Sequence, residues 1–206
     1  RGIPIATCPG VNSGIVAELA IMLMLAGYRN LLQINRQLRE GHFPRTEYFG
    51  RSFMIKGKTV GVLGLGHIGK KVAALVTAFG ANVIYYDILR QPEQEEKFGY
   101  RFVDFDTLLE QSDIFTVHCP LNEETRGMIS FEQFKKMKPS AMLINTARGP
   151  IVDEAAMIDA LTTGKIATAG LDTYEHEPLP KDHPLLKLDN VVASAHAGGN
   201  TKDNDI

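Results

Sequence analysis

The strongest constraint on the fold is an alternation of short apolar runs with helix-period segments, which begins at Lys58. The runs are residues 59–63, 83–86, 114–118, 142–145, 168–171 and 191–193. The helix-period segments are residues 68–79, 105–111, 131–137 and 154–163. Apolar strands that alternate with helices are typical of a parallel sheet covered on both faces, and right-handed crossovers wind such a sheet in two directions. The sequence therefore predicts an α/β fold with a doubly wound parallel sheet.

Composition limits the class of protein. The 206 residues suggest one large domain or one and a half, and 44% of them are hydrophobic, as in globular proteins. Lys and Arg number 22 against 24 Asp and Glu, so the net charge of −2 offers no basic surface to nucleic acid. Cys8 and Cys119 are too few for a disulfide framework and lack metal-ligand spacing. We expect no metal, no nucleic-acid partner and a reducing, cytoplasmic compartment.

The chain contains no apolar stretch of the about 18 residues that a membrane span needs. The nearest candidate, 14–32, is interrupted by Glu18, Arg29 and Asn30, which favours a buried helix at a core or subunit interface. There is no secretory signal, and the chain begins at Arg1 rather than at methionine. We therefore expect no membrane partner and a fragment of a longer product.

The first 57 residues differ from the rest. A long apolar helix is predicted from Ser13 to about Arg39. The segment 41–57 then follows without a helical period and carries four aromatic side chains, Phe43, Tyr48, Phe49 and Phe53. Such a segment is not expected to leave all of its aromatic side chains in water. This aromatic arm is therefore expected to pack either on its own chain or on a second subunit.

A glycine-rich turn follows the first predicted strand directly and opens the next helix. Gly64 permits the tight turn, Gly66 lets the backbone approach a pyrophosphate, and Gly69 allows the helix to pack closely on the strand. The helix N-terminus offers free N–H groups and a partial positive charge to phosphates. Asp87 ends the next strand 18 positions after Gly69, against an expected spacing of about 20. These features predict a dinucleotide-binding (Rossmann) domain.

The residues around this turn favour NAD as the cofactor. His67 and Ile68 lie inside the turn, where backbone contact matters more than the side chain. Asp87 would accept hydrogen bonds from the adenosine ribose and repel a 2′-phosphate, which favours NAD over NADP. Arg90 would instead favour NADP, because its side chain would contact a 2′-phosphate if the loop turned back. The alternative to a cofactor site is a glycine-rich turn in an unrelated α/β fold.

Polar residues follow the later strands of the predicted sheet. Arg148 comes after the strand 142–145, Asp172 and Glu177 after the next, and His196 after the last. Ligands bind at the carboxyl ends of parallel strands, so these side chains have a common place to meet. An arginine suits bidentate capture of a carboxylate, and a histidine with a carboxylate partner is an acid–base near neutral pH. With a nicotinamide beside them, they predict oxidation of a 2-hydroxy acid or reduction of a 2-keto acid.

Each of these residues also has a simpler interpretation. Taken alone, Arg148 is equally consistent with a surface ion pair, Glu177 with the start of a turn, and His196 with a satisfied loop histidine. Their joint placement after successive strands is what favours a site. His42 and His183 are expected in solvent, as is His176.

Five stretches resemble the NAD-binding domain of the D-isomer-specific 2-hydroxyacid dehydrogenases, a family that includes phosphoglycerate, glycerate and lactate dehydrogenases and glyoxylate and hydroxypyruvate reductases. They are V-G-V-L-G-L-G-H-I-G-K, V-H-C-P-L-N-E-E-T-R-G-M-I, L-I-N-T-A-R-G-P-I-V-D-E, G-L-D-T-Y-E-H-E-P-L-P and D-N-V-V-A-S-A-H-A-G-G-N-T. They occur in family order, and the upstream V-N-S-G-I-V-A-E-L-A extends the resemblance to nearly the whole chain. The H-A-G-G-N-T ending resembles the phosphoglycerate and glycerate type more than the lactate type.

The resemblance implies roles for individual residues. Arg148 matches the arginine that binds the substrate carboxylate and polarises the reacting carbonyl. His196 matches the acid–base, Glu177 its hydrogen-bonding carboxylate, and Asp172 the aspartate that holds the nicotinamide carboxamide. The resemblance also implies cofactor contacts at Cys119, Thr146, Gly198 and Cys8. A formate dehydrogenase would have glutamine in place of Glu177, so that relative is disfavoured.

The resemblance also implies an organisation of the chain. We expect an apolar helix and aromatic arm at 1–57, which forms a homodimer interface, and an NAD-binding domain at 58–199. Residues 200–206 would begin the return to a second lobe that is largely absent. Phe43 stands where tryptophan is common in the family. The rival hypothesis is a non-catalytic NAD sensor, like the related corepressors of the C-terminal-binding type, which keep the same three polar residues.

Overall fold

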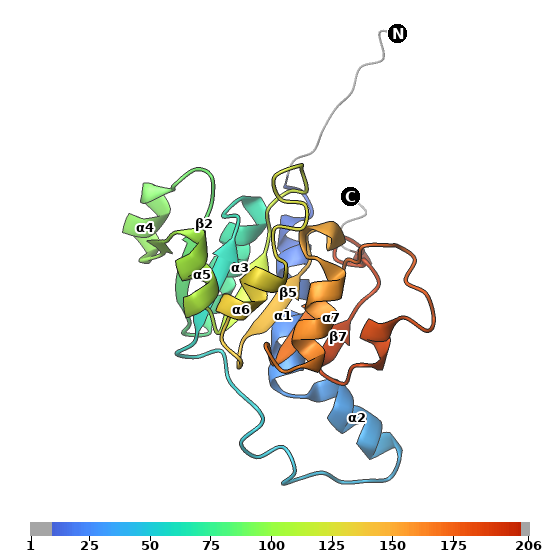
Figure 1. Ribbon diagram of the computed structural model, residues 1–206. Helices are drawn as coiled ribbons and strands as arrows, with labels where there is room; N and C mark the ends of the chain where they lie inside the picture. The colour runs from blue at the N-terminus through green and yellow to red at the C-terminus, as the bar shows by residue number, and fades with distance from the viewer. Residues whose placement is uncertain (1–9, 203–206) are drawn as a thin grey trace.

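The computed structural model describes residues 10–202, in which seven parallel strands form one sheet in the order β3-β2-β1-β4-β5-β6-β7 (Figure 1). The strands are β1 (Thr59–Leu63), β2 (Asn82–Tyr86), β3 (Arg101–Phe102), β4 (Ile114–Val117), β5 (Met142–Asn145), β6 (Thr168–Leu171) and β7 (Val191–Ala193). The α-helices are α1 (Ser13–Tyr28), α2 (Leu31–Arg39), α3 (His67–Ala78), α4 (Pro92–Phe98), α5 (Phe105–Gln111), α6 (Phe131–Lys136) and α7 (Glu154–Thr162). Two short 3-10 helices are η1 (Gly149–Ile151) and η2 (Pro184–Lys187). The prediction of a doubly wound α/β fold is confirmed.

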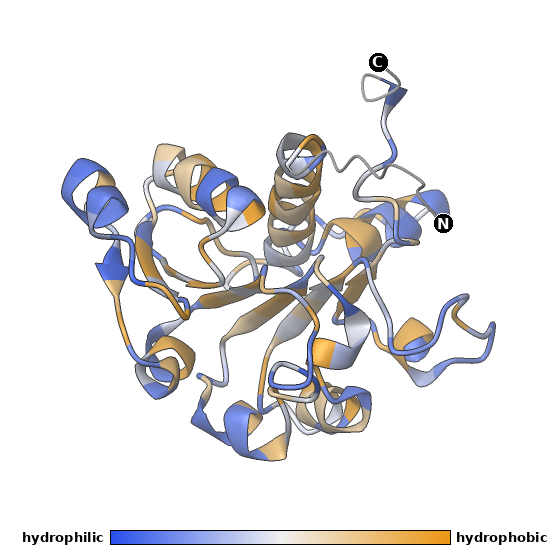
Figure 2. Ribbon diagram, turned by 90° about the horizontal axis from the view of Figure 1, so that it is seen from above, coloured by the Kyte–Doolittle hydropathy of each residue, from blue (hydrophilic) through white to orange (hydrophobic). Residues whose placement is uncertain are grey.

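Helices cover both faces of the sheet, whose strands are largely apolar (Figure 2). On one face α1 and α3 pack against each other, with α3 over β1 and β2 and α1 over β5, β6 and β7. On the other face α5, α6 and α7 pack side by side, with α5 against β1 and β2. The buried side chains accordingly form two hydrophobic clusters, one beneath each helical layer.

Successive side chains along one strand enter opposite clusters, because the side-chain period of a strand is two. In β4, Ile114 belongs to the cluster beneath α1 and α3, whereas Phe115 belongs to the cluster beneath α5, α6 and α7. Met142 and Leu143 of β5 divide in the same way. All four side chains are fully buried. Because both faces are covered, the strands read as unbroken apolar runs rather than as alternating patterns.

The single helix predicted over 13–39 is wrong, because the chain forms two helices with a bend of 63° between them. α1 ends at Tyr28 and α2 begins at Leu31. Between them Asn30 has φ 50°, in the left-handed region that a continuous right-handed helix does not contain. The Asn30 side chain donates a hydrogen bond to the Arg51 carbonyl (3.1 Å), which links the bend to the aromatic arm.

Helix α1 packs closely in the core. Ala17, Leu23 and Met24 are fully buried. Gly27 faces the sheet so closely that an added Cβ would lie 2.6 Å from the Met142 Cε. No single helix within residues 10–202 is long and apolar enough to cross a membrane, although the bent α1–α2 pair meets that test by length and composition.

The aromatic arm is anchored at its end by Phe53. The Phe53 ring lies 5.6 Å from that of Tyr28, and the Phe53 N–H donates to the Tyr28 carbonyl (2.9 Å). Phe43 and Phe49 are 74% and 76% exposed, so these two rings do not pack on the described part of the chain. Phe53 therefore packs on its own chain. For Phe43 and Phe49, packing on a second subunit stays a prediction.

The sequence pattern does not predict β3 or α4. β3 has two residues, and α4 has the sequence Pro-Glu-Gln-Glu-Glu-Lys-Phe, which lacks an apolar helical period. The boundaries of the predicted domains, 1–57, 58–199 and 200–206, stay predictions. Residues 1–9 and 203–206 lie outside the part that the structure describes.

The glycine turn allows a direct test of how closely α3 packs on it. A Cβ at Gly69 would lie 2.0 Å from the Gly64 carbonyl oxygen, whereas a Cβ at Gly66 would meet nothing within 4 Å. We expect Gly69→Ala to lower the free energy of unfolding by about 1–3 kcal/mol, as overpacking does, and Gly66→Ala by less than about 1 kcal/mol. Urea unfolding of both variants measures the difference. Equal transition midpoints would contradict the close packing at Gly69.

Candidate active site

The glycine turn lies where the strand order of the sheet reverses, between β1 and β4. Gly64 has φ 90°, and a Cβ at this position would lie 2.7 Å from the backbone nitrogen of Cys119. Both the backbone angle and the close approach require glycine. Open α/β sheets bind ligands in the crevice at such a reversal. The predicted phosphate turn therefore occupies the position at which the fold offers a ligand site.

Asp87 and Gln91 hold the turn from the β2–α4 connection. The Asp87 Oδ2 accepts a hydrogen bond from the Leu65 N–H (2.7 Å), and the Gln91 Nε2 donates to the Leu65 carbonyl (3.1 Å). Both backbone groups of Leu65 are therefore bonded to this connection. Asp87 lines a cavity of about 330 Å³ together with Gly64 and Gly66.

The space along this edge of the sheet fits a dinucleotide. The backbone at Gly66 is open, since an added Cβ would meet nothing within 4 Å, and the N-terminus of α3 follows it directly. The Thr146 Oγ1 is buried and has no hydrogen-bond partner among the described residues. A second cavity of about 830 Å³ shares His118, Cys119 and Pro120 with the first. The two adjoining compartments suit the two halves of a dinucleotide.

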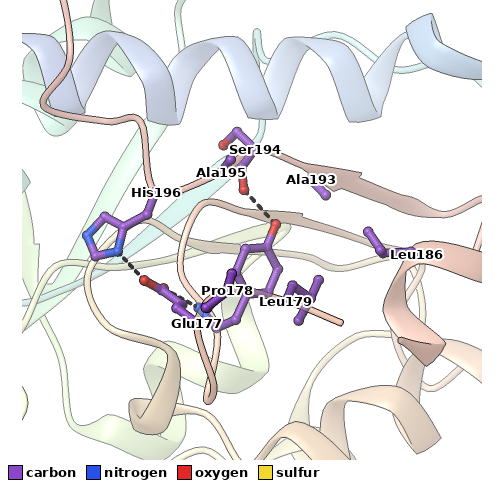
Figure 3. Close-up of a pocket in the computed structure, with 9 residues that line it drawn as sticks. Glu177, Pro178, Leu179, Leu186, Ala193, Ser194, Ala195 and His196 are labelled. Atoms are coloured by element: carbon purple, nitrogen blue, oxygen red, sulfur yellow. Dashed lines mark hydrogen bonds and ion pairs between the residues drawn. The ribbon is translucent and has the colours of Figure 1, made fainter. Parts of the chain in front are cut away.

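Most of the predicted site residues line these cavities. The members of the predicted set in the second cavity are Ile68, Cys119, Thr146, Arg148, Asp172, His196 and Gly198. Glu177 lines a third cavity of about 650 Å³, to which His196 also contributes (Figure 3). His67 and Gly69 line none of these three cavities. Cys8 lies outside the described residues.

Asp172 fixes the loop that carries the histidine. Its carboxylate is buried and accepts hydrogen bonds from the Ser194 Oγ (2.6 Å), the Ala197 N–H (2.9 Å) and the Gly198 N–H (2.9 Å). His196 lies between these donors with φ 51°, a backbone angle that costs energy in any residue other than glycine. The three bonds to Asp172 hold the strained position of His196.

His196 and Glu177 form a close pair. The His196 Nδ1 lies 2.6 Å from the Glu177 Oε2, and the Glu177 Oε1 accepts a hydrogen bond from the Tyr174 N–H (3.0 Å) (Figure 3). Burial pushes the pKa of Glu177 upward, but the hydrogen bonds from His196 and Tyr174, with the charges of His196 and Arg148, hold it below its usual value. An ionised carboxylate only accepts hydrogen bonds, so the His196 Nδ1 is the donor in this pair and the Nε2 is left free of Glu177.

Arg148 is positioned by the buried end of β5. The Asn145 side chain donates to the Arg148 carbonyl (3.0 Å) and accepts from the Ala147 N–H (3.1 Å), which shapes the loop after the strand. The exposed Arg148 guanidinium donates to the Ala147 carbonyl (2.7 Å). A Cβ at Gly149 would lie 1.9 Å from the Tyr174 carbonyl carbon. The loop that carries Arg148 therefore packs directly on the loop that carries Glu177. Asn145 was missed by sequence reasoning, although a polar residue at a strand end could have indicated it.

The expectation that His183 lies in solvent is wrong. Its side chain is 14% exposed, and its Nε2 lies 3.0 Å from the Glu154 Oε1. Glu154 begins α7 and also accepts a hydrogen bond from the Glu175 N–H (3.5 Å). This pair therefore ties α7 to the loop that carries Glu177. His42 pairs with Glu47 on the surface.

Cys119 and His118 pack beneath the glycine turn. Burial raises the pKa of the Cys119 thiol to about 11 and lowers the pKa of His118 to about 3. His118 is therefore neutral near pH 7, with its Nε2 2.8 Å from the Thr116 Oγ1. Within residues 10–202 no group of three or more acidic, histidine or cysteine side chains could hold a metal ion.

The sheet, the glycine turn and the polar carboxyl edge define a dinucleotide-binding α/β domain. Residues 21–198 match the family model described as D-isomer specific 2-hydroxyacid dehydrogenase, NAD binding domain. Because this match covers most of the chain, the chain belongs to that family. The predicted resemblance and the prediction of NAD as the cofactor are confirmed at the level of the family.

Relatives of several activities share nearly the whole chain. The D-3-phosphoglycerate dehydrogenase of Archaeoglobus fulgidus is 47% identical over 98% of this chain and 38% of its own length. The glyoxylate reductase of Thermofilum pendens is 45% identical over 98% of this chain and 60% of its own length. The apo D-mandelate dehydrogenase of Rhodotorula graminis superposes with a TM-score of 0.93 at 32% identity, over 99% of this chain and 61% of that one. The chain thus spans 38% to 61% of the length of these relatives.

The burial of Cys119 leads to a test of its reactivity. In a Cys8→Ser variant, Cys119 is the remaining thiol. Because its pKa is about 11, little thiolate is present at pH 8, and we expect alkylation by iodoacetamide to be at least about tenfold slower than in the same chain unfolded in urea. The rate should rise as the pH approaches 11. Equal rates in the folded and unfolded chain at pH 8 would contradict the burial of the Cys119 thiol and its raised pKa.

Proposed function

We propose that this chain provides the NAD site and the acid–base residues of an enzyme that interconverts D-2-hydroxy acids and 2-keto acids. The observation that carries the proposal is the His196–Glu177 pair, with 2.6 Å between Nδ1 and Oε2. His196 shares a cavity with Arg148, and that cavity adjoins the glycine turn. A carboxylate-binding cation, an acid–base and a dinucleotide site are the parts that this reaction needs.

Each residue contributes a distinct step. Arg148 binds the substrate carboxylate through its guanidinium and polarises the reacting carbonyl. In the oxidation of the hydroxy acid, the His196 Nε2 takes the hydroxyl proton, and in the reverse direction it returns that proton to the carbonyl oxygen. Glu177 accepts the hydrogen bond from the His196 Nδ1 and so orients the imidazole. NAD, when bound, supplies the hydride-transfer chemistry.

The cofactor would be held along the carboxyl edge of the sheet. We assign it to the turn residues Gly64, Gly66, His67, Ile68 and Gly69 and to Asp87, Cys119, Thr146, Asp172 and Gly198. The Asp172 Oδ2 accepts one hydrogen bond, from the Gly198 N–H, and so has capacity for the nicotinamide amide. Thr146 adds a buried hydroxyl that has no partner among the described residues.

The remaining elements of the proposal concern the whole protein. We propose that these residues work with a second lobe, since the relatives are longer than this chain. We propose a substrate of the phosphoglycerate or glycerate type, since the Archaeoglobus relative is a D-3-phosphoglycerate dehydrogenase. The exposed Phe43 and Phe49 support a homodimer that forms through the aromatic arm. The cytoplasmic location stays a prediction.

Calorimetric titration of the chain with NAD and NADP tests the cofactor site, and NADH oxidation with a panel of 2-keto acids tests the activity of the complete protein. We expect saturable NAD binding and oxidation with at least one keto acid. NAD binding without turnover on any acid would favour the NAD-sensing alternative. Absence of NAD binding would contradict the proposed site.

His196→Ala is expected to lower kcat about 10²–10⁴-fold, the usual contribution of a general acid–base, while NAD affinity stays nearly unchanged. Steady-state kinetics on the complete protein measures the loss, and the NAD titration serves as the control for folding. A decrease of less than tenfold would remove His196 from this role.

Asp87→Ala is expected to weaken NAD binding more than NADP binding. The carboxylate lines the cavity of about 330 Å³, which we assign to the adenosine half of the cofactor, and there it would accept from the ribose hydroxyls and repel a 2′-phosphate. Because the Asp87 carboxylate also bonds the Leu65 N–H, both affinities should fall to some extent. The ratio of the two dissociation constants is the measurement, and an unchanged ratio would contradict the ribose assignment.

A further inference from the structure

A second acidic residue, Glu95 of α4, pairs with an arginine of the β2–α4 connection. Arg90 belongs to the same β2–α4 connection as Asp87 and is the one basic side chain between Asp87 and Glu95. The Arg90 Nε and Nη2 donate to the two carboxylate oxygens of Glu95, at 2.8 Å each. This is the bidentate geometry in which an arginine also binds phosphate.

Glu95 is held in place from the opposite side. The Tyr85 hydroxyl donates to the Glu95 Oε1 (2.9 Å) and accepts from the Gln91 N–H (2.8 Å). The Glu95 side chain is 18% exposed, although its partner Arg90 is 62% exposed. The hydrogen bond from Arg90, against the effect of burial and with help from Tyr85, lowers the pKa of Glu95 to about 2. Glu95 is therefore ionised at any pH at which the enzyme would work.

Arg90 is also restrained through its flat face. Its guanidinium carbon lies 5.8 Å from the centre of the Phe102 ring, within the range of a cation–π contact. The same connection reaches the glycine turn through Gln91, whose side chain donates to the Leu65 carbonyl. Arg90 is therefore held by an organised network that extends from the turn to α4.

We propose that Glu95 is a specificity-determining residue that withholds Arg90 from a 2′-phosphate. This inference rests on the proposed function. Asp87 disfavours the 2′-phosphate by charge repulsion. Glu95 disfavours the phosphate by occupying two N–H donors of Arg90, whose charge would otherwise neutralise it. The fold itself accepts either cofactor, because an imino acid reductase that superposes at a TM-score of 0.85 is in complex with NADPH. The difference between NAD and NADP thus depends on side chains of the β2–α4 connection.

Glu95→Gln tests this inference, since glutamine keeps an acceptor for Tyr85 but loses the charge that holds Arg90. We expect the Kd for NADPH to fall about five- to tenfold, while the Kd for NADH changes less than about twofold. Glu96→Gln, an exposed neighbour on α4, removes the same charge and should change neither constant. Fluorescence titration of the chain with each reduced cofactor provides both values, and urea midpoints check the folding.

Two arginine variants make the test decisive. Arg90→Gln alone should leave NADPH affinity within about twofold, because Arg90 is already occupied, and Arg90→Gln combined with Glu95→Gln should abolish the gain. A Glu95→Gln variant that binds NADPH no better, or a gain that survives loss of Arg90, would overturn the role of Glu95. A wild-type chain that binds neither cofactor would instead overturn the proposed NAD site and this inference with it.

Discussion

The parallel direction of all seven strands is the constraint on which the rest of the structure depends. A parallel sheet must be covered on both faces, so the chain has to return through a helix or loop after each strand, and every loop at a strand's carboxyl end meets at one edge. That edge collects Asp87 after β2, Arg148 after β5 and His196 after β7. Backbone topology alone thus makes residues that are far apart in the sequence neighbours in space.

The buried carboxylate of Asp172 then fixes the conformation of one loop at this edge, the loop that carries His196. Removing Asp172 from water costs free energy that three hydrogen bonds from the loop offset. The same bonds hold His196 at a positive φ, so burial of one charge and orientation of the acid–base are a single structural feature. Glu177 is fixed differently, through the Tyr174 N–H and through a loop that packs on Gly149.

The sequence predicts the elements whose signal is hydrophobic. Six strands and four helices follow apolar runs and periods, and the cavities contain most of the predicted residues because strand ends locate them. β3 and α4 have too little apolar character to be predicted from the hydrophobic pattern. The break between α1 and α2 depends on the left-handed backbone angle of Asn30 and on its hydrogen bond to Arg51, which the pattern does not contain. The bonds of Asp172 join residues 22 to 26 positions apart, so no local pattern reveals them. The pairing of His183 with Glu154 is hidden for the same reason.

The polar groups at the carboxyl edge fall into two kinds. Asp172 and Asn145 are buried and engaged in several hydrogen bonds to their own loops, which gives them a structural role. Thr146, Arg148 and the His196 Nε2 retain hydrogen-bonding capacity, and all three residues line one cavity. Buried polar groups are normally paired, so the buried Thr146 hydroxyl, which has no partner among the described residues, is suited to bond a ligand in that cavity. The first kind shapes the site, although the Asp172 Oδ2 keeps capacity for one further donor, and the second kind is available to a bound molecule.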